Sequence, residues 1–260
     1  MVVKKISFKN FRKQTLRGFV HLPSKKKSNR KALIYLHGFP GHCTGSAEVF
    51  AKLFEKLGYL VLRFDFSGTD LSDGTFSNKL MSCEVTEVKD AIDFLFAKYG
   101  DQFDELILSG ISTGAIDASL YAHTDKRVSK LVLLGAVSDL KHAVRYDFSA
   151  VQVHDFWTKG YVKYSREGKW MHGKKIKKKF YDEFFKLDIP KAIRSWNGPT
   201  LIVHGSLDEA IPVTDPKKLF EICNKPKKLL IVRGADHVFS NPIHGLKVVK
   251  AIDKFGRKKF

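Results

Sequence analysis

Residues 105–115 read ELILSGISTGA, and this stretch decides the fold that we expect for the chain. Residues 106–108 are an apolar run with the branching of a buried strand, and a helix-compatible stretch follows from Ala115. Between them stands the pattern GxSxG, with glycines at 110 and 114, where a Cβ would collide with the neighbouring strand or helix. In this context the pattern predicts a nucleophile elbow, in which a strained backbone lifts the Ser112 hydroxyl clear of the sheet. The alternative is an ordinary strand-to-helix turn, because the motif by itself is common in a chain with 19 glycines.

The rest of the chain alternates strand and helix patterns around this stretch. Further buried strands are expected at 32–36, 59–66, 131–137, 200–204 and 229–232, and helices at 47–57, 85–99, 216–223 and 246–255. Residues 4–8 and 16–22 predict an antiparallel hairpin at the start of the chain. This alternation is typical of an α/β fold, with a mostly parallel sheet covered by helices on both faces.

The alternation breaks between residues 138 and 196. This segment contains all three tryptophans and a dense lysine run, but no clean succession of strand and helix. We therefore expect an insertion on a core that is formed by residues 1–137 and 197–260. Four aromatic side chains of the insertion are candidates for contacts with the acyl group of a substrate: Trp157, Tyr161, Tyr164 and Trp170. The alternative is that these rings make only a small core within the insertion.

The charge of the chain is unusual. Its 46 Lys and Arg residues against 27 Asp and Glu residues give a net charge of +19. Such a surface favours anionic partners, although a lysine-rich surface can also be no more than a solvated one. No sequence pattern of a nucleic-acid-binding motif accompanies the charge, so we expect no specific nucleic-acid partner.

The composition predicts a cytoplasmic protein without a membrane span. No apolar run approaches the ~20 residues that cross a bilayer, and the alternating apolar and basic N-terminus is unlike a signal peptide. The three cysteines, Cys43, Cys83 and Cys223, form neither a CxxC pair nor a metal-ligand spacing. We therefore expect free thiols in a reducing compartment and no metal site.

A serine nucleophile needs a base that takes its proton and a carboxylate that orients this base. After a nucleophile elbow, the acid and the histidine are expected in that order along the chain. The strand expected at 200–204 is followed by Asp208, and the strand at 229–232 is followed by His237. Because parallel strands end at one edge of a sheet, both side chains can converge on Ser112. The alternatives are three neighbours: Glu209 or Asp236 as the acid, and His244 as the base.

The oxyanion that forms in acyl transfer needs fixed hydrogen-bond donors. One donor is expected to be the backbone N–H of Thr113, directly after the serine. The second is expected from the loop after the strand at 32–36, where Phe39 keeps its N–H and Pro40 holds Phe39 out of the helical region. The pattern therefore predicts an oxyanion hole made by the N–H groups of Phe39 and Thr113.

Five motifs in this order, HGFPGH, RFDFSGTDLSDG, GISTG, HGSLDEAIP and GADHVF, resemble the α/β-hydrolase superfamily. The likeness covers residues 32–137 and 199–245. It is greatest to the branch of cinnamoyl and feruloyl esterases and of monoacylglycerol-lipase-like or dienelactone-hydrolase-like enzymes. The resemblance implies an α/β-hydrolase fold, hydrolysis of carboxylic esters without a cofactor, and an insertion that acts as a cap or lid. The chain departs from the family at Asp70, where relatives usually have glycine, and at Thr113 and Ala115 beside the serine.

We therefore interpret the chain as a serine esterase that acts on a small-molecule ester through an acyl-enzyme. Ser112 is the expected nucleophile, His237 the base and Asp208 the residue that orients the base. A thioesterase, an acylglycerol lipase or an acylaminopeptidase would use the same groups. A possibility of another class is a catalytically idle hydrolase fold that binds an anionic partner, which only the charge supports.

Overall fold

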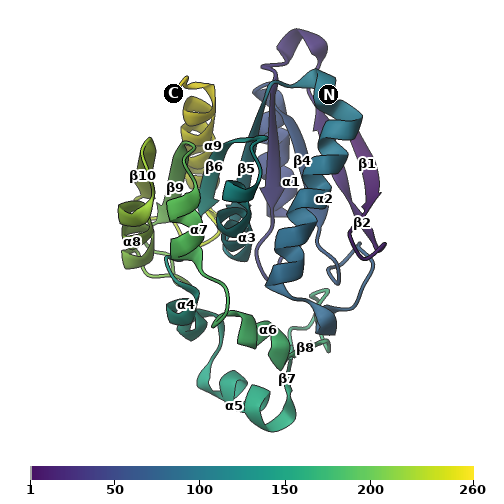
Figure 1. Cartoon of the computed structure of the whole chain (residues 1–260), viewed down its shortest axis with the longest axis vertical. Coiled ribbons are helices and arrows are strands. Elements are labelled where there is room, and N and C mark those ends of the chain that lie inside the picture. Colours follow the sequence, from purple (N-terminus) through teal and green to yellow (C-terminus); the bar gives the residue numbers. More distant parts are fainter. Residues whose placement is uncertain (1) are drawn as a thin grey trace.

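A mixed sheet of eight strands forms the centre of the computed structural model, which describes residues 2–260 (Figure 1). Its strands are β1 (Val2–Lys9), β2 (Thr15–Leu22), β3 (Lys31–Leu36), β4 (Leu60–Asp65), β5 (Glu105–Ile111), β6 (Val128–Leu134), β9 (Thr200–Gly205) and β10 (Lys227–Val232). Across the sheet they lie in the order β1-β2-β4-β3-β5-β6-β9-β10. The β1–β2 and β2–β4 pairs are antiparallel, and the other pairs are parallel. The predicted opening hairpin and mostly parallel sheet are therefore confirmed.

Helices cover both faces of the sheet, as predicted. One face carries α1 (Ser46–Lys56) and α9 (Pro242–Arg257). The other face carries α2 (Met81–Tyr99), α3 (Thr113–Tyr121), α7 (Ile189–Ser195) and α8 (Thr214–Ile222). The fold is that of an open α/β sheet between two helical layers.

The alternation of side chains along each strand produces a core on either face. In β3, Leu33 belongs to the core that includes Phe50 of α1, whereas Ile34 belongs to the core that includes Ile92 of α2. Strands buried on both faces must be apolar throughout, which explains runs such as ALIYL and ELILS.

The segment between β6 and β9 forms several short elements beyond one end of the sheet (Figure 1). They are α4 (Leu140–Asp147), α5 (Ala150–Lys159), the two-stranded hairpin β7 (Tyr161–Lys163) and β8 (Lys175–Lys177), and α6 (Lys178–Glu183). The last element of the predicted insertion, α7, instead contacts α3 and α8 and belongs to the helical layer on the sheet. The division of the chain at residues 138 and 196 stays a prediction.

The helices and cysteines agree with the composition. No helix within residues 2–260 has an apolar stretch of the length that crossing a bilayer requires. The longest helix, α2, buries one face, with Val88, Ile92 and Leu95 directed toward the sheet. Cys43, Cys83 and Cys223 are free thiols, as expected.

Candidate active site

Ser112 lies on the tight turn that joins β5 to α3. Its backbone angles, φ 55° and ψ −124°, lie in a region that residues with side chains rarely adopt. Its N–H donates to the Leu134 carbonyl oxygen of the neighbouring β6 at 2.9 Å. A Cβ on Gly110 would lie 2.0 Å from the Gly114 oxygen, and a Cβ on Gly114 would lie 2.4 Å from the Leu36 oxygen. The two glycines therefore allow the turn to present a half-buried serine at the carboxyl end of β5.

Asp208 and His237 follow the carboxyl ends of β9 and β10 and contact each other. The His237 Nδ1 is 2.8 Å from Asp208 Oδ2, while Asp208 Oδ1 accepts the N–H groups of Ala210 and Ile211 at 2.9 and 2.8 Å. Burial raises the pKa of Asp208, but the hydrogen bond and charge of His237 outweigh it, so the net pKa is below its ordinary value. Asp208 is therefore ionised at neutral pH. It orients the imidazole so that Nε2 is the atom left to exchange a proton.

The three alternative residues contact the surrounding loops. The Asp236 carboxylate accepts the N–H of Ser240 at 2.8 Å and also its hydroxyl. The Glu209 carboxylate is 3.3 Å from the backbone nitrogen of His237, so it contacts the loop and not the imidazole. His244 lies in the first turn of α9, beside Gly234.

Two residues that the sequence analysis does not single out pack against the Asp208–His237 pair. His204 is fully buried, and its Nε2 lies 3.2 Å from Asp208 Oδ2 and 2.9 Å from the Ile211 carbonyl oxygen. Burial lowers the pKa of His204, so its ring is neutral at pH 7. Gly135 has a φ of +52°, and a Cβ there would lie 2.9 Å from His237 Cε1. Two sequence features could have indicated these residues. His204 is a histidine in an otherwise apolar strand, and Gly135 is a glycine just after a core strand.

His37 fixes the backbone of the loop that follows β3. It is buried, its Nδ1 is 2.8 Å from the Gly38 carbonyl oxygen, and its Nε2 accepts the Phe66 N–H at 3.4 Å. Burial, together with the charge of Lys79, lowers the pKa of His37 to about 3, so the neutral ring donates from Nδ1 to Gly38. Because a trans peptide directs its carbonyl and its N–H to opposite sides, the held Gly38 oxygen also orients the N–H of Phe39.

Two backbone N–H groups are available beside the serine. Gly38 packs so closely on Ser112 that a Cβ on the glycine would lie 2.8 Å from the Ser112 Cβ. The N–H groups of Phe39 and of Thr113, the first residue of α3, donate no hydrogen bond within residues 2–260. Such a pair of free donors is what an oxyanion at Ser112 would need.

One cavity of about 570 Å³ is lined by both Ser112 and His237. Its lining includes Gly38, Phe39, Ser112, Arg166, Trp170 and His237. Among the hydrogen bonds of residues 2–260, none joins the Ser112 hydroxyl to His237, and such contacts are often looser without substrate. No group of three or more His, Cys, Asp or Glu side chains in this described part of the chain is arranged to hold a metal ion.

Of the four aromatic residues predicted to contact substrate, Trp170 lines this cavity. Its indole N–H donates to the Pro40 carbonyl oxygen at 3.1 Å, which connects the β7–β8 loop to the loop after β3. Tyr164 is buried and does not line the cavity. Its ring centroid lies 5.9 Å from that of the lining residue Phe39 and 5.5 Å from that of Phe76. Tyr164 therefore supports the wall of the cavity.

The other two aromatic residues lie outside this lining. Trp157 is 68% exposed, and the Lys178 ammonium lies 4.0 Å from its ring centroid. Tyr161 has the Lys175 ammonium at the same distance, 4.0 Å, from its ring. A substrate contact of Trp157 or Tyr161 stays a prediction. The position of neither ring favours it, because neither residue lines the cavity.

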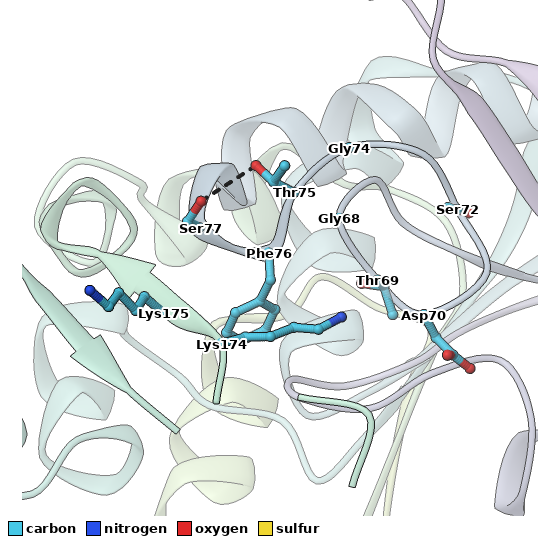
Figure 2. Close-up of a pocket in the computed structure, with 10 residues that line it drawn as sticks. All are labelled: Gly68, Thr69, Asp70, Ser72, Gly74, Thr75, Phe76, Ser77, Lys174 and Lys175. Atoms are coloured by element: carbon cyan, nitrogen blue, oxygen red, sulfur yellow. Dashed lines mark hydrogen bonds between the residues drawn. The ribbon is translucent and has the colours of Figure 1, made fainter. Parts of the chain in front are cut away.

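A second cavity, of about 430 Å³, lies beyond Phe76 (Figure 2). It is lined by the turn at residues 68–77 and by Lys174 and Lys175. Asp70 in this turn has a φ of 23°, a conformation that aspartate tolerates where relatives usually have glycine. Neither Ser112 nor His237 lines this cavity, so it is separate from the candidate active site.

Comparison with known proteins identifies the family. A family model described as serine aminopeptidase, S33, matches residues 27–176, more than half of the 260-residue chain. The chain belongs to this family of α/β-hydrolases. The matched range includes Phe39 and Ser112 and ends before Asp208 and His237. The resemblance expected from the sequence motifs is therefore confirmed.

The curated relatives of this α/β-hydrolase are distant and longer. Alpha/beta hydrolase domain-containing protein 17B of Xenopus laevis is 26% identical over 210 residues, which are 81% of this chain and 61% of the relative. Alpha/beta hydrolase domain-containing protein 17C of Homo sapiens is 23% identical over 210 residues, 81% of this chain and 54% of the relative. The chain thus spans somewhat more than half the length of these relatives.

Several solved structures share the α/β-hydrolase fold. Est1E from Butyrivibrio proteoclasticus, bound to ferulic acid, has a TM-score of 0.79 at 21% identity and covers 96% of this chain and 97% of its own. The esterase domain of a Rhodothermus marinus protein has a TM-score of 0.73 at 22% identity, and the match covers 99% of this chain and 98% of that domain. The Pyrococcus furiosus esterase Pf2001 has a TM-score of 0.74 at 18% identity, and the match covers 98% of this chain and 91% of the esterase. At such identities the likeness concerns the fold and not the substrate.

Proposed function

We propose that this α/β-hydrolase is a serine hydrolase that cleaves carboxylic esters through an acyl-enzyme intermediate. The observation that carries the proposal is that Ser112, on its strained turn, shares one cavity with His237, whose imidazole contacts the Asp208 carboxylate. Esterases among the structural neighbours share this fold, and an ester is therefore the substrate class that we propose.

In the proposed acylation step, Ser112 Oγ attacks the ester carbonyl carbon while His237 Nε2 takes the hydroxyl proton. The carbonyl oxygen becomes an oxyanion, which the N–H groups of Phe39 and Thr113 stabilise. The intermediate then expels the alcohol, which receives the proton from His237, and Ser112 keeps the acyl group. In the second step water gives a proton to His237 and attacks the acyl carbon, and Ser112 regains its proton as the acid leaves. Asp208 stays ionised throughout and stabilises the imidazolium.

We also infer that residues 138–196 act as a cap on a core formed by residues 1–137 and 197–260. The loop between β7 and β8 supplies Trp170 to the cavity that contains Ser112. At the other end of the segment, α7 contacts α3 and α8 and so anchors the cap to the helical layer. A cap in this position would shape the acyl site without supplying the nucleophile or the base.

The first test replaces the proposed nucleophile. Ser112→Ala is expected to lower kcat for p-nitrophenyl acetate by on the order of 10⁴-fold or more, because the bond-forming atom is gone. A fluorophosphonate probe is expected to label the wild-type protein and not this variant. Ser109→Ala is the matched control, because Ser109 is a buried serine of β5, the strand that leads to Ser112, and its hydroxyl has no hydrogen-bond partner within residues 2–260.

Near-wild-type hydrolysis by a folded Ser112→Ala protein would exclude this nucleophile. Failure of the wild-type protein both to bind the probe and to cleave any ester would instead favour an idle binding fold. A series of esters of increasing acyl length, together with a feruloyl ester, a monoacylglycerol, an acyl-CoA and an acylated peptide, separates the esterase from its alternatives. The proposal expects the carboxylic esters to give the highest kcat/KM.

A further inference from the structure

Two basic side chains of the cap lie at the cavity that contains Ser112. Arg166 and Lys169 line this cavity from the loop between β7 and β8, next to Trp170 and Met171. Ser112 and His237 line the same cavity from the core. A substrate that reaches the serine therefore passes or contacts two positive charges.

No negative charge balances these two residues. The lining of the cavity contains no Asp or Glu side chain. Within residues 2–260, neither Arg166 nor Lys169 makes an ion pair or a side-chain hydrogen bond. By contrast, the cap lysines Lys159 and Lys178 pair with Asp155 at 2.8 Å and Asp182 at 2.5 Å. Arg166 and Lys169 thus have no acidic partner among the described residues, and their N–H donors are free to bind a ligand.

Two acidic residues of the cap come near the site without lining this cavity. Glu167 stands between the two basic residues in sequence and is exposed. Asp147 at the end of α4 is accessible to water yet surrounded by protein, and burial raises its pKa to about 6, an effect that the charge of His237 counteracts. Since neither carboxylate contacts Arg166 or Lys169, the cavity keeps its positive rim.

The second cavity provides a contrast, because its two lysines contact aromatic rings. Lys174 and Lys175 line it, but Asp70 lines it as well. The Lys174 ammonium lies 4.8 Å from the Trp170 ring, and that of Lys175 lies 4.0 Å from the Tyr161 ring. Figure 2 shows Lys175 extending away from the turn that carries Thr69 and Asp70. The lining of the Ser112 cavity thus carries two basic side chains and no carboxylate, whereas this cavity has one carboxylate beside its two lysines.

We propose that Arg166 and Lys169 bind an anionic group of the substrate, a carboxylate or a phosphate, and that the enzyme prefers esters that carry one. This inference rests on the proposed esterase function. A guanidinium presents paired N–H donors that match a carboxylate or a phosphate, and an ammonium adds a point charge beside it. The two side chains act on substrate choice, while Ser112, His237 and Asp208 carry out the reaction.

The test compares an anionic with a neutral ester in the wild type and in Arg166→Gln/Lys169→Gln. p-Nitrophenyl hemisuccinate, with its free carboxylate, is paired with p-nitrophenyl butyrate, which has a similar length and no charge. The change from wild type to variant in the ratio of kcat/KM for the anionic ester to that for the neutral ester cancels the intrinsic reactivity of each ester. We expect this ratio to fall by about 10- to 100-fold in the double variant.

The matched control is Lys163→Gln/Lys179→Gln, which removes two exposed charges of the same cap. Neither lysine lines the cavity or makes an ion pair within residues 2–260, and the control ratio should stay within about twofold of the wild type. A second arm places the anion on the leaving group, by comparing 4-acetoxybenzoate and an acyl-CoA with phenyl acetate. A fall of the anionic-to-neutral ratio in Arg166→Gln/Lys169→Gln in either arm supports the proposal. The arm in which it falls indicates whether the anion belongs to the acyl group or to the leaving group.

An unchanged ratio in both arms for Arg166→Gln/Lys169→Gln would overturn the inference while the hydrolysis of neutral esters persists. An equal fall in the control variant would also overturn it, because the effect would then come from the general charge of +19. If the wild type cleaves neither the anionic nor the neutral ester, the proposed function itself fails. If it cleaves the neutral ester and the ratio does not change in the double variant, only the anion site fails.

Discussion

At the scale of single residues, the candidate site depends as much on missing side chains as on those present. His237 packs against Gly135 so closely that a Cβ would lie 2.9 Å from its Cε1 and 3.1 Å from its Nδ1. The same Cβ would be 3.7 Å from Asp208 Oδ2. Nδ1 is the atom that contacts Asp208, so the glycine leaves the space in which the imidazole takes its orientation.

Gly135→Ala is expected to lower kcat/KM for a neutral ester by about 100-fold, since displacement of a catalytic group by ~1 Å can have this effect. Gly160→Ala is the control, because Gly160 also has a positive φ, 75°, but no atom within 4 Å of a Cβ. Both variants should lose similar stability, on the order of 1 kcal/mol, from backbone strain. Equal activity of the two folded variants would show that Gly135 does not position His237.

At the scale of elements, the β7–β8 loop and the loop after β3 form the two walls of the cavity. Trp170 connects them through its hydrogen bond to the Pro40 carbonyl oxygen. Behind this contact the rings of Phe39 and Phe180 stack with centroids 4.8 Å apart, and those of Phe39 and Phe76 with centroids 5.6 Å apart. The loop that carries the Phe39 N–H is therefore packed directly against α6, which belongs to the segment between β6 and β9.

Trp170→Ala is expected to reduce kcat/KM for a long or aromatic acyl ester by about tenfold or more. Loss of the apolar area of one ring is worth ~1–3 kcal/mol, and an acetyl group is too short to use it fully. Trp157→Ala is the control, because this ring is 68% exposed and outside the cavity lining. Rates should be measured for acetyl, octanoyl and feruloyl esters. Equal effects of the two substitutions on all three esters would contradict a role of Trp170 in acyl recognition.

At the scale of the whole molecule, the helix that begins after Ser112 also carries a carboxyl group into the core. Asp117 of α3 is fully buried, and neither of its carboxyl oxygens has a hydrogen-bond partner within residues 2–260. Burial raises its pKa well above the ordinary value, and the negative charge of Glu84 raises it further, against the charge of Lys79. The folded protein therefore holds a proton on Asp117 that the unfolded chain releases near pH 4.

This proton makes the stability of the whole chain depend on pH. Because the folded pKa exceeds the unfolded one, the contribution of Asp117 is fully present below about pH 4 and is lost as the pH rises toward the folded pKa. Asp117→Asn mimics the protonated group at every pH. The free energy of unfolding of Asp117→Asn minus that of the wild type should therefore be larger at pH 8 than at pH 4, so that the variant gains relative stability as the pH rises.

Denaturant unfolding of the wild type, Asp117→Asn and the exposed control Asp101→Asn at both pH values measures this difference. A difference between wild type and Asp117→Asn that does not change with pH would mean that the carboxyl is ionised in the fold. The comparison uses the change with pH, so any constant cost of the buried amide cancels.

The sequence by itself determined the α/β class and the place of the elbow. Strands buried on both faces need continuous apolar runs, and amphipathic helices need a 3.6-residue period, so both leave local patterns that can be read without the fold. The turn at Ser112 leaves a pattern too, because its two glycines are required by contacts within a few residues and with the adjacent strand. Asp208 and His237 were predictable as candidates, since each follows the end of a core strand.

Only the tertiary structure decided what surrounds these groups. Gly135 is distant in sequence from His237 and meets it only through the order β6-β9-β10 of the sheet, and the same order brings Asp208, with His204 beside it, to His237. Between β6 and β9, Trp157 is exposed while Trp170 lines the cavity, although both are tryptophans within one irregular segment. Short elements that pack on a surface distant in sequence are too short for a hydrophobic period that would show which of their side chains face inward. The positive rim of Arg166 and Lys169 could likewise not be told from the other basic residues, because charge acts at a site only where folding has placed it.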